Sequence, residues 1–173
     1  MTPLYQKQKD ADHEVDVLSR MASAITSIER PIGYIHYPSA TYMIDGCLTN
    51  KDGGVHCWVE VKPRGGYALK FMKRNSAIID VTKYMVLRDL SNMTGVASYL
   101  VFKTRDDHLL IHQVQTSGAV NLRIKPDFER KGRGDLNDID AVIMIPYGMF
   151  KGIVPFGGFR SEKSNATVKV GQP

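Results

Sequence analysis

The sequence predicts a single α/β domain in which helices flank a mixed central β-sheet. The chain has 173 residues, 43% of them hydrophobic, which suits one continuous core but not two ordinary domains. Two segments repeat apolar residues at helical spacing, and shorter runs between and after them are rich in β-branched and aromatic residues. We expect the folded domain to cover residues 1–153. A flexible tail is expected over residues 154–173, which are rich in Gly, Ser, Lys and Val.

The first predicted helix covers residues 10–28. Apolar residues recur there at helical spacing, from Val17 and Leu18 through Met21 to Ile28, with polar residues between them. Pro31 follows closely and cannot continue a helix. The segment therefore predicts an amphipathic helix that packs one face on the sheet.

Three predicted strands come next, at residues 34–37, 41–48 and 55–62. Each is rich in β-branched and aromatic residues. The last two are separated by the segment Asn50-Lys51-Asp52-Gly53-Gly54, whose composition is typical of a turn. These two strands are expected to form a β-hairpin.

The second half of the chain predicts another helix and three more strands. Helical periodicity returns over residues 76–93 and ends at Gly95, which suits a helix C-cap. Strands are expected at residues 97–103 and 108–114, on either side of a turn, and at residues 141–145. The basic stretch before the last strand, which includes residues 123–133, is interpreted as a solvated loop.

Composition favours a protein that binds polyanions. There are 23 Lys and Arg residues against 18 Asp and Glu, so the net charge is +5. No stretch approaches the roughly 20 apolar residues of a membrane span, and no apolar run near the start resembles a signal peptide. Cys47 and Cys57 are too few for a disulfide scaffold, so reduced thiols are expected. Together these features predict a cytoplasmic protein with no membrane association and favour a polyanionic partner without requiring one; many basic proteins bind no nucleic acid.

The predicted hairpin places charged side chains on one face. Strand alternation puts Val59 and Val61 on an apolar side and Glu60 and Lys62 on the other. On the preceding strand, Asp45 faces away from the apolar side and becomes a cross-strand neighbour of Glu60 if the turn sets that register.

Two facing carboxylates repel each other unless a cation lies between them. Oxygen ligands on adjacent strands suit Mg²⁺ or Mn²⁺, so Asp45 and Glu60 are candidate metal ligands. Lys62 would project into the same pocket, where an ammonium can orient water and stabilise charge on a phosphate. The combination predicts phosphodiester hydrolysis.

The spacing of Asp45, fourteen intervening residues and Glu60-Val61-Lys62 resembles the PD-(D/E)xK nuclease superfamily, over about residues 10–114. The resemblance implies a restriction-endonuclease-like core, a Mg²⁺-dependent nuclease acting on DNA, and Lys62 as the catalytic lysine. Superfamily members such as Holliday junction resolvases often place a glutamate on the first helix, which implies Glu14 as a third ligand. Many also carry a Lys on the helix after this strand, which implies Lys83 as a second catalytic cation. The chain departs from the pattern where Ile44, and not Pro, precedes Asp45.

A basic loop follows the proposed site. Its cations could bind phosphates, and Tyr67 and Phe71 between them could stack on bases. The candidate nucleic-acid-binding residues are Arg64, Lys70, Lys73 and Arg74.

Other readings of these residues remain open. Asp45-Gly46 could be ordinary turn chemistry, Glu60 and Lys62 an exposed pair on an edge strand, and Glu14 an exposed residue in an acidic first turn. Lys83 could extend from the edge of its helix stripe into solvent. The five histidines show no metal-ligand spacing and receive no role.

Three functions are therefore compared. The first is the Mg²⁺-dependent nuclease. The second keeps the nuclease-like fold as a non-catalytic module that binds nucleic acid or protein. The third is an accessory protein of a larger assembly, and a homodimer is also open.

Overall fold

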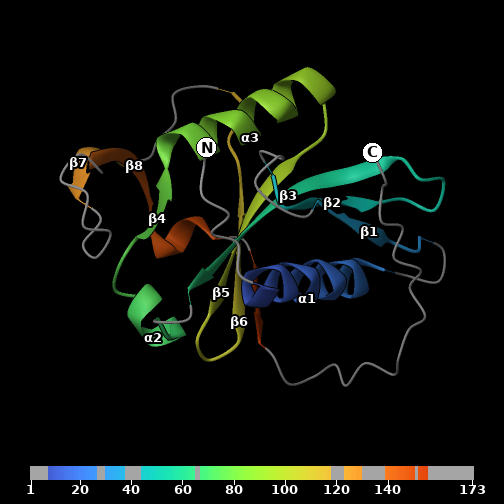
Figure 1. The fold of residues 1–173 in the computed structure, drawn as a ribbon, viewed down its shortest axis with the longest axis horizontal. Coiled ribbons are helices and arrows are strands. Elements are labelled where there is room, and N and C mark those ends of the chain that lie inside the picture. The colour runs from blue at the N-terminus through green and yellow to red at the C-terminus, as the bar shows by residue number, and fades with distance from the viewer. Residues whose placement is uncertain are drawn as a thin grey trace.

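The computed structural model describes residues 8–26, 30–37, 44–64, 67–117, 123–129, 139–150 and 152–155. Two longer helices, α1 (Gln8–Ile25) and α3 (Val81–Thr94), lie on opposite faces of a central sheet (Figure 1). Among the described residues, no helix is both long enough and apolar enough to cross a membrane.

The central sheet contains six strands in the order β1-β2-β3-β5-β6-β9. The neighbours β3 and β5 run parallel, and the other neighbouring pairs are antiparallel, so the sheet is mixed. The predicted α/β fold is thereby confirmed. The strands are β1 (Gly33–His36), β2 (Gly46–Thr49), β3 (Val55–Arg64), β5 (Ser98–Thr104), β6 (His108–Gln113) and β9 (Gly152–Pro155).

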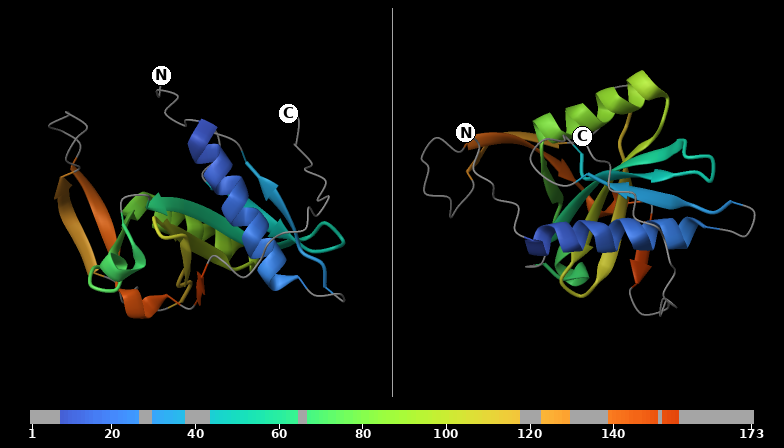
Figure 2. Two further views of the ribbon diagram at one scale, coloured as in Figure 1. Left: turned by 90° about the horizontal axis from the view of Figure 1, so that it is seen from below. Right: turned by 45° about the vertical axis from the view of Figure 1, so that its right-hand side comes forward.

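A second, three-stranded sheet has the order β4-β8-β7. Its strands are β4 (Ala77–Asp80), β8 (Ile139–Ile145) and β7 (Arg123–Glu129). Figure 2 shows β7 and β8 at the end of the molecule far from β1. A short helix, α2 (Leu69–Met72), follows β3, and a 3-10 turn, η1 (Tyr147–Met149), follows β8.

Each face of the central sheet is covered by its own apolar cluster. On the α1 side, Leu18 and Met21 pack with Val59 and Val61 of β3. On the α3 side, the cluster is built from α3, β5, β6 and the second sheet, and Trp58 packs against it. Because alternate residues of β3 enter the two clusters, burial fixes which face of this strand each side chain occupies.

The hairpin β2–β3 forms as predicted. Asn50 N donates to Gly54 O at 2.8 Å, and Gly53 has the positive φ of +84° that glycine accommodates readily. Cys57 belongs to the α1-side cluster, and both Cys47 and Cys57 are buried free thiols, as the sequence predicts.

The predicted helix over residues 76–93 is wrong in its first part. Residues Ala77–Asp80 form β4, which pairs antiparallel with β8, and α3 begins only at Val81. Asp80 caps α3, because its Oδ1 accepts hydrogen bonds from Thr82 N at 2.7 Å and Lys83 N at 3.4 Å. The predicted end is confirmed, since the C-cap Gly95 has a φ of +70°.

The expectation for residues 41–48 needs a similar correction. The strand β2 starts at Gly46, while Ile44 and Asp45 form a bend and residues 41–43 lie outside the described part. The bend also changes the face of Ile44, which packs in the α3-side cluster while Leu48 packs in the α1-side cluster. Regular strand alternation over residues 41–48 would have placed both on one face.

Three further elements were not predicted. The stretch interpreted as a loop contains β7, which pairs with β8 through an irregularity between Lys125 and Phe128. The helix α2 and the strand β9 were also missed. Strand β9 pairs with β6 and extends two residues past 153, while residues 156–173 lie outside the described part.

Candidate active site

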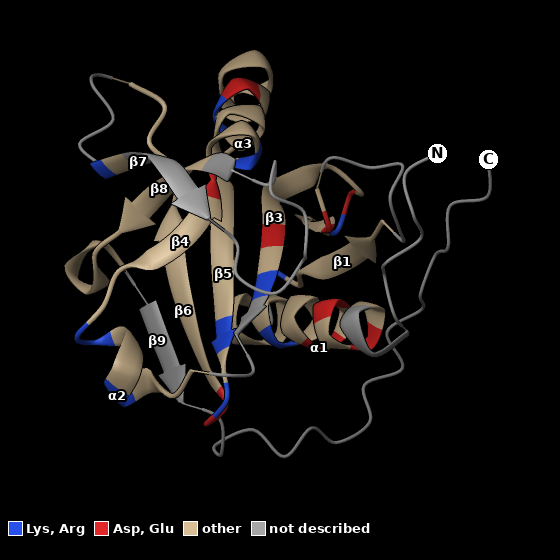
Figure 3. Cartoon of the chain, turned by 60° about the vertical axis from the view of Figure 1, so that its left-hand side comes forward, with Lys and Arg blue, Asp and Glu red and all other residues tan. Residues whose placement is uncertain are grey.

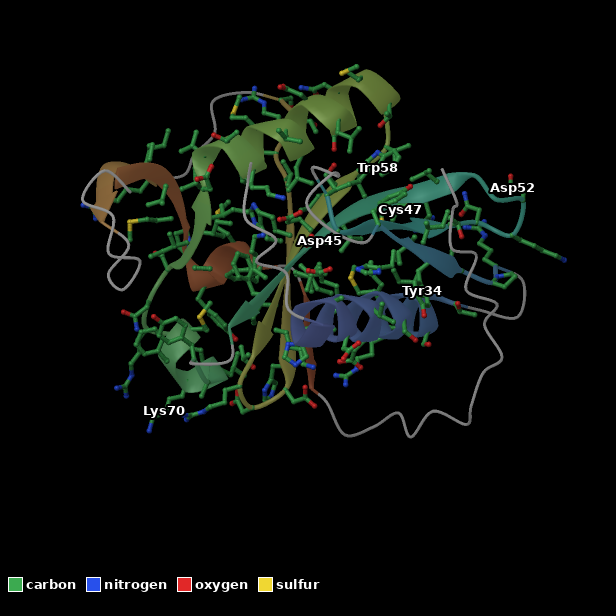
Figure 4. The ribbon with its side chains drawn as sticks, in the orientation of Figure 1. Tyr34, Asp45, Cys47, Asp52, Trp58 and Lys70 are labelled. Atoms are coloured by element: carbon green, nitrogen blue, oxygen red, sulfur yellow. The ribbon has the colours of Figure 1, made fainter. Side chains whose placement is uncertain are left out.

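The candidate site lies where β2 leaves the central sheet. The last β2–β3 pair joins Gly46 to Val59, and β3 continues beyond it to Arg64 beside β5. Asp45 immediately precedes that pair, so its position continues the register opposite Glu60. Its Oδ2 accepts a hydrogen bond of 2.7 Å from Val61 N, which takes the place of main-chain pairing there. Figure 4 shows Asp45 beside the first half of α1.

Gly46 is required by close packing and not by a turn. A Cβ at this position would lie 2.5 Å from Ile35 O and 2.7 Å from Leu18 Cδ1. Gly46 lies within β2, so the interpretation of Asp45-Gly46 as a turn pair is wrong. The missing side chain lets α1 approach the start of β2 closely.

That approach brings Glu14 of α1 to the site. Only 6% of Glu14 is exposed, so the interpretation as a solvated first-turn residue is wrong. Its Oε2 lies 2.9 Å from His36 Nε2, and His36 pairs with Gly46 across β1 and β2. His36 received no role from the sequence. The available signal was its position on a strand next to the one that carries Asp45.

Glu60 is completely buried in the middle of the sheet. Strand β3 has neighbours on both sides, so the interpretation as an exposed edge pair is wrong. Glu60 Oε1 contacts Lys62 Nζ and lies 3.1 Å from Lys83 Nζ. Glu60 Oε2 is buried and has no hydrogen-bond partner among the described residues. A carboxylate oxygen in this position is costly without a cation or a donor.

Lys83 reaches the site from the first turn of α3. The salt bridge to Glu60 shows that its side chain turns toward β3, and not only along the helix edge into solvent. Two ammonium groups therefore meet one buried carboxylate, and they come from different elements. This arrangement offsets part of the cost of burying Glu60.

Burial and the neighbouring carboxylates also change the pKa of Asp45. Burial raises its pKa from the usual 3.8 to about 7, and the carboxylates of Glu60 and Glu14 contribute to the increase. The Lys62 ammonium and the hydrogen bond from Val61 N act in the opposite direction. A site that penalises an ionised Asp45 in this way favours an added positive charge.

The predicted site residues Glu14, Asp45, Glu60, Lys62 and Lys83 thus form one connected set, drawn from α1, the bend before β2, β3 and α3. Asp45 lies within electrostatic reach of Glu14, Glu60 and Lys62, and Glu60 contacts Lys62 and Lys83. Within the described ranges, no three His, Cys, Asp or Glu side chains are already arranged as a ligand set for a metal ion. In this structure the Lys62 and Lys83 ammonium groups are the cations in contact with Glu60.

The predicted nucleic-acid-binding residues come after the site in the chain, at the end of β3 and around α2. Lys70, Lys73 and Arg74 are exposed, and Figure 3 shows basic residues on α2. Lys73 Nζ also lies 5.9 Å from the centre of the Tyr147 ring. Arg64 is the last residue of β3, but its side chain lies outside the described part.

One comparison with known proteins identifies a family. The family model described as "Phage putative PDDEXK endonuclease" matches residues 1–153. No curated protein and no solved structure matches the chain. The match covers every described element from α1 to η1 and all five residues of the connected set, and it confirms the resemblance to the PD-(D/E)xK superfamily.

Proposed function

Because the chain belongs to the phage PDDEXK endonuclease family, we propose that it is a metal-dependent nuclease that hydrolyses phosphodiester bonds in DNA. One observation carries the proposal. Asp45 is hydrogen-bonded to the main chain between Glu60 and Lys62, so the acidic and basic residues of the motif meet at one point.

Glu14, Asp45 and Glu60 would hold Mg²⁺ or Mn²⁺. Their oxygen atoms are the ligands that these ions prefer. The buried Oε2 of Glu60 has no hydrogen-bond partner among the described residues, and the raised pKa of Asp45 reflects burial together with surplus negative charge. Both features fit a bound cation. An ion there would act as a Lewis acid on the phosphate and help to ionise water.

Lys62 would be the catalytic lysine. Its ammonium contacts Glu60, so it lies beside a proposed metal ligand, where it could bind a phosphate oxygen or orient the attacking water. Lys83 would supply a second positive charge from α3. Cations placed where negative charge develops stabilise the transition state of phosphoryl transfer.

The exposed cations around α2 would bind the DNA backbone next to this site. Lys70, Lys73 and Arg74 supply charge without base recognition, which suits a positioning role. We place the reaction in the cytoplasm, where the two buried thiols Cys47 and Cys57 would stay reduced.

The direct experiment is a cleavage assay with the full chain. Labelled duplex DNA, branched DNA, single-stranded DNA and RNA would be incubated with Mg²⁺, with Mn²⁺ or with EDTA. The proposal expects DNA products with either metal and none with EDTA. Binding that survives EDTA without any product under either metal would instead support a non-catalytic binding module, and products from RNA alone would overturn the choice of DNA.

A further inference from the structure

Two aromatic rings are stacked on the surface next to the candidate site. Tyr67 and Phe71 have ring centres 4.4 Å apart and planes inclined by 10°. The residues are 43% and 45% exposed, respectively. Large aromatic side chains usually bury their faces, so an exposed stacked pair suggests a binding surface.

The segment that carries these rings is anchored. Arg105 N donates to Tyr67 O at 2.8 Å, and Asp106 Oδ1 accepts from Leu69 N at 2.8 Å. Met72, at the end of α2, is buried in the α3-side cluster. The main chain under the rings is therefore held by the β5–β6 turn and by the core, which reduces the entropy lost when a ligand stacks.

The main chain that carries the stacked pair lies beyond Lys62 along the paired strands β3 and β5. Lys62 pairs with Phe102 of β5. Tyr67 is bonded to Arg105, three residues beyond Phe102 on the same chain. At about 3.3 Å for each residue, the main chain of Tyr67 stands roughly 10 Å from that of Lys62 along the strand direction. That is the reach of a few nucleotides.

Exposed cations lie next to the rings in the sequence. Lys70 and Lys73 flank Phe71 in the sequence, Arg74 follows, and all three residues are exposed. Exposed rings interleaved with cations match the two parts of a nucleic-acid strand, because bases stack on rings and phosphates pair with cations.

We infer that Tyr67 and Phe71 form a stacking platform for unpaired bases, which directs the nuclease to DNA with a single-stranded segment beside the cut. The inference rests on the proposed nuclease function. In a continuous duplex, neighbouring bases cover both faces of every base, so rings on the protein surface have nothing to stack on. A flap or an unpaired end offers a free base face.

The test measures binding by the full chain in EDTA. One probe is a duplex that carries a short single-stranded flap with 2-aminopurine at its unpaired positions, and the other is a fully paired duplex of the same length with paired 2-aminopurine. The wild type should bind the flap probe at least about tenfold more tightly and quench its fluorescence. Absence of quenching in the wild type would overturn the inference directly.

The variant Tyr67→Leu/Phe71→Leu removes the rings and keeps apolar side chains. Binding of the flap probe should weaken roughly ten- to hundredfold, while the affinity for the paired duplex should change by less than about twofold. The exchange Tyr67→Phe/Phe71→Tyr keeps both rings and should bind like the wild type. Met93→Ala, a change at an exposed apolar residue of α3, serves as the surface control. Equal losses of affinity on both probes, or no loss on either, would contradict the platform.

Two further measurements separate the possible failures. Thermal unfolding checks that the double Leu variant is folded, and the single variant Tyr67→Leu replaces it if it is not. Cleavage of both probes by the wild type with Mn²⁺ is then recorded. Flap preference without cleavage would support the stacking platform and contradict the nuclease function. Cleavage without flap preference would support the nuclease function and contradict the platform.

Discussion

The carboxylate of Asp45 accepts a 2.7 Å hydrogen bond from the main-chain N–H of Val61, the residue between Glu60 and Lys62. A residue at the start of one strand is thereby tied to the centre of the motif on the next. The bond directs Asp45 toward Glu60 although their charges repel. The repulsion between the two carboxylates is therefore unfavourable for folding, and its effect on the free energy of unfolding can be measured without an activity assay.

Asp45→Asn should stabilise the metal-free protein above neutral pH. Since the folded-state pKa of Asp45 is raised from 3.8 to about 7, the folded protein binds its proton more tightly than the unfolded chain does. That stabilisation is complete below about pH 4 and is lost as the pH rises through 7. Asn has no proton to lose, so the variant should exceed the wild type by roughly 1–3 kcal/mol at about pH 8.

Urea unfolding in EDTA between about pH 4 and pH 8 provides the measurement. The difference in unfolding free energy between Asp45→Asn and the wild type should widen as the pH increases. Parallel pH profiles for the two proteins would show that Asp45 does not titrate in this range.

Lys62 and Lys83 should stabilise the fold through the same buried carboxylate, so that either lysine partly compensates for loss of the other. Each contacts Glu60 Oε1, so replacing one with Met leaves the other ammonium beside the buried carboxylate. We expect a loss of about 1 kcal/mol for each single variant and about 3–5 kcal/mol for the double variant, which removes both ammonium groups from Glu60. Lys51→Met in the exposed hairpin turn is the control. Strictly additive losses in a double-mutant cycle would rule out a shared role.

Glu14→Gln should weaken metal binding and leave the fold intact. The amide oxygen of Gln can still accept a hydrogen bond from His36, but the negative charge is lost. Affinity for Mn²⁺ measured by calorimetry should fall at least about tenfold. Asp12→Asn, a change at an exposed residue of the same helix, should leave the affinity close to that of the wild type. Unchanged affinity in Glu14→Gln would remove Glu14 from the ligand set.

The cations around α2 should determine the salt dependence of DNA binding. Replacing Lys70, Lys73 and Arg74 with Ala should lower the slope of log affinity against log salt by about 0.9 for each duplex phosphate that the variant no longer neutralises. Lys51→Ala changes the net charge by one at a distant turn and is the matched control. If the triple variant keeps both the affinity and the slope of the wild type, the DNA follows another path.

The sequence predicts the hairpin at the site well because two local rules agree there. The turn before Val55 limits the register, and alternation along β3 separates Glu60 from Val59 and Val61. A register shift between Leu48 and Thr49 moves the pairing by one residue from the register at the turn, and with this shift Gly46 pairs with Val59 and Asp45 comes opposite Glu60. The alternation along β3 can be read from the sequence, but this local irregularity cannot.

Elements whose partners are distant in sequence were harder to predict. Strand β4 merges with the helical pattern of α3, and the only local sign of the boundary is Asp80, a preferred N-cap residue. In β7, Pro126 and an irregular register interrupt the alternation, so only pairing with β8 makes it a strand. His36 likewise becomes relevant only when α1 brings Glu14 to it.

The most direct measurement compares metal binding and DNA cleavage in the wild type, Asp45→Asn and Lys62→Ala. Asp45→Asn removes an oxygen ligand, so Mn²⁺ affinity and cleavage should both fall, and a higher Mn²⁺ concentration should partly restore cutting. Lys62→Ala keeps the carboxylates, so Mn²⁺ should still bind while turnover drops by roughly two to four powers of ten. Equal cleavage by all three proteins would contradict the proposed roles of Asp45 and Lys62, as would a wild type that neither binds metal nor cuts DNA.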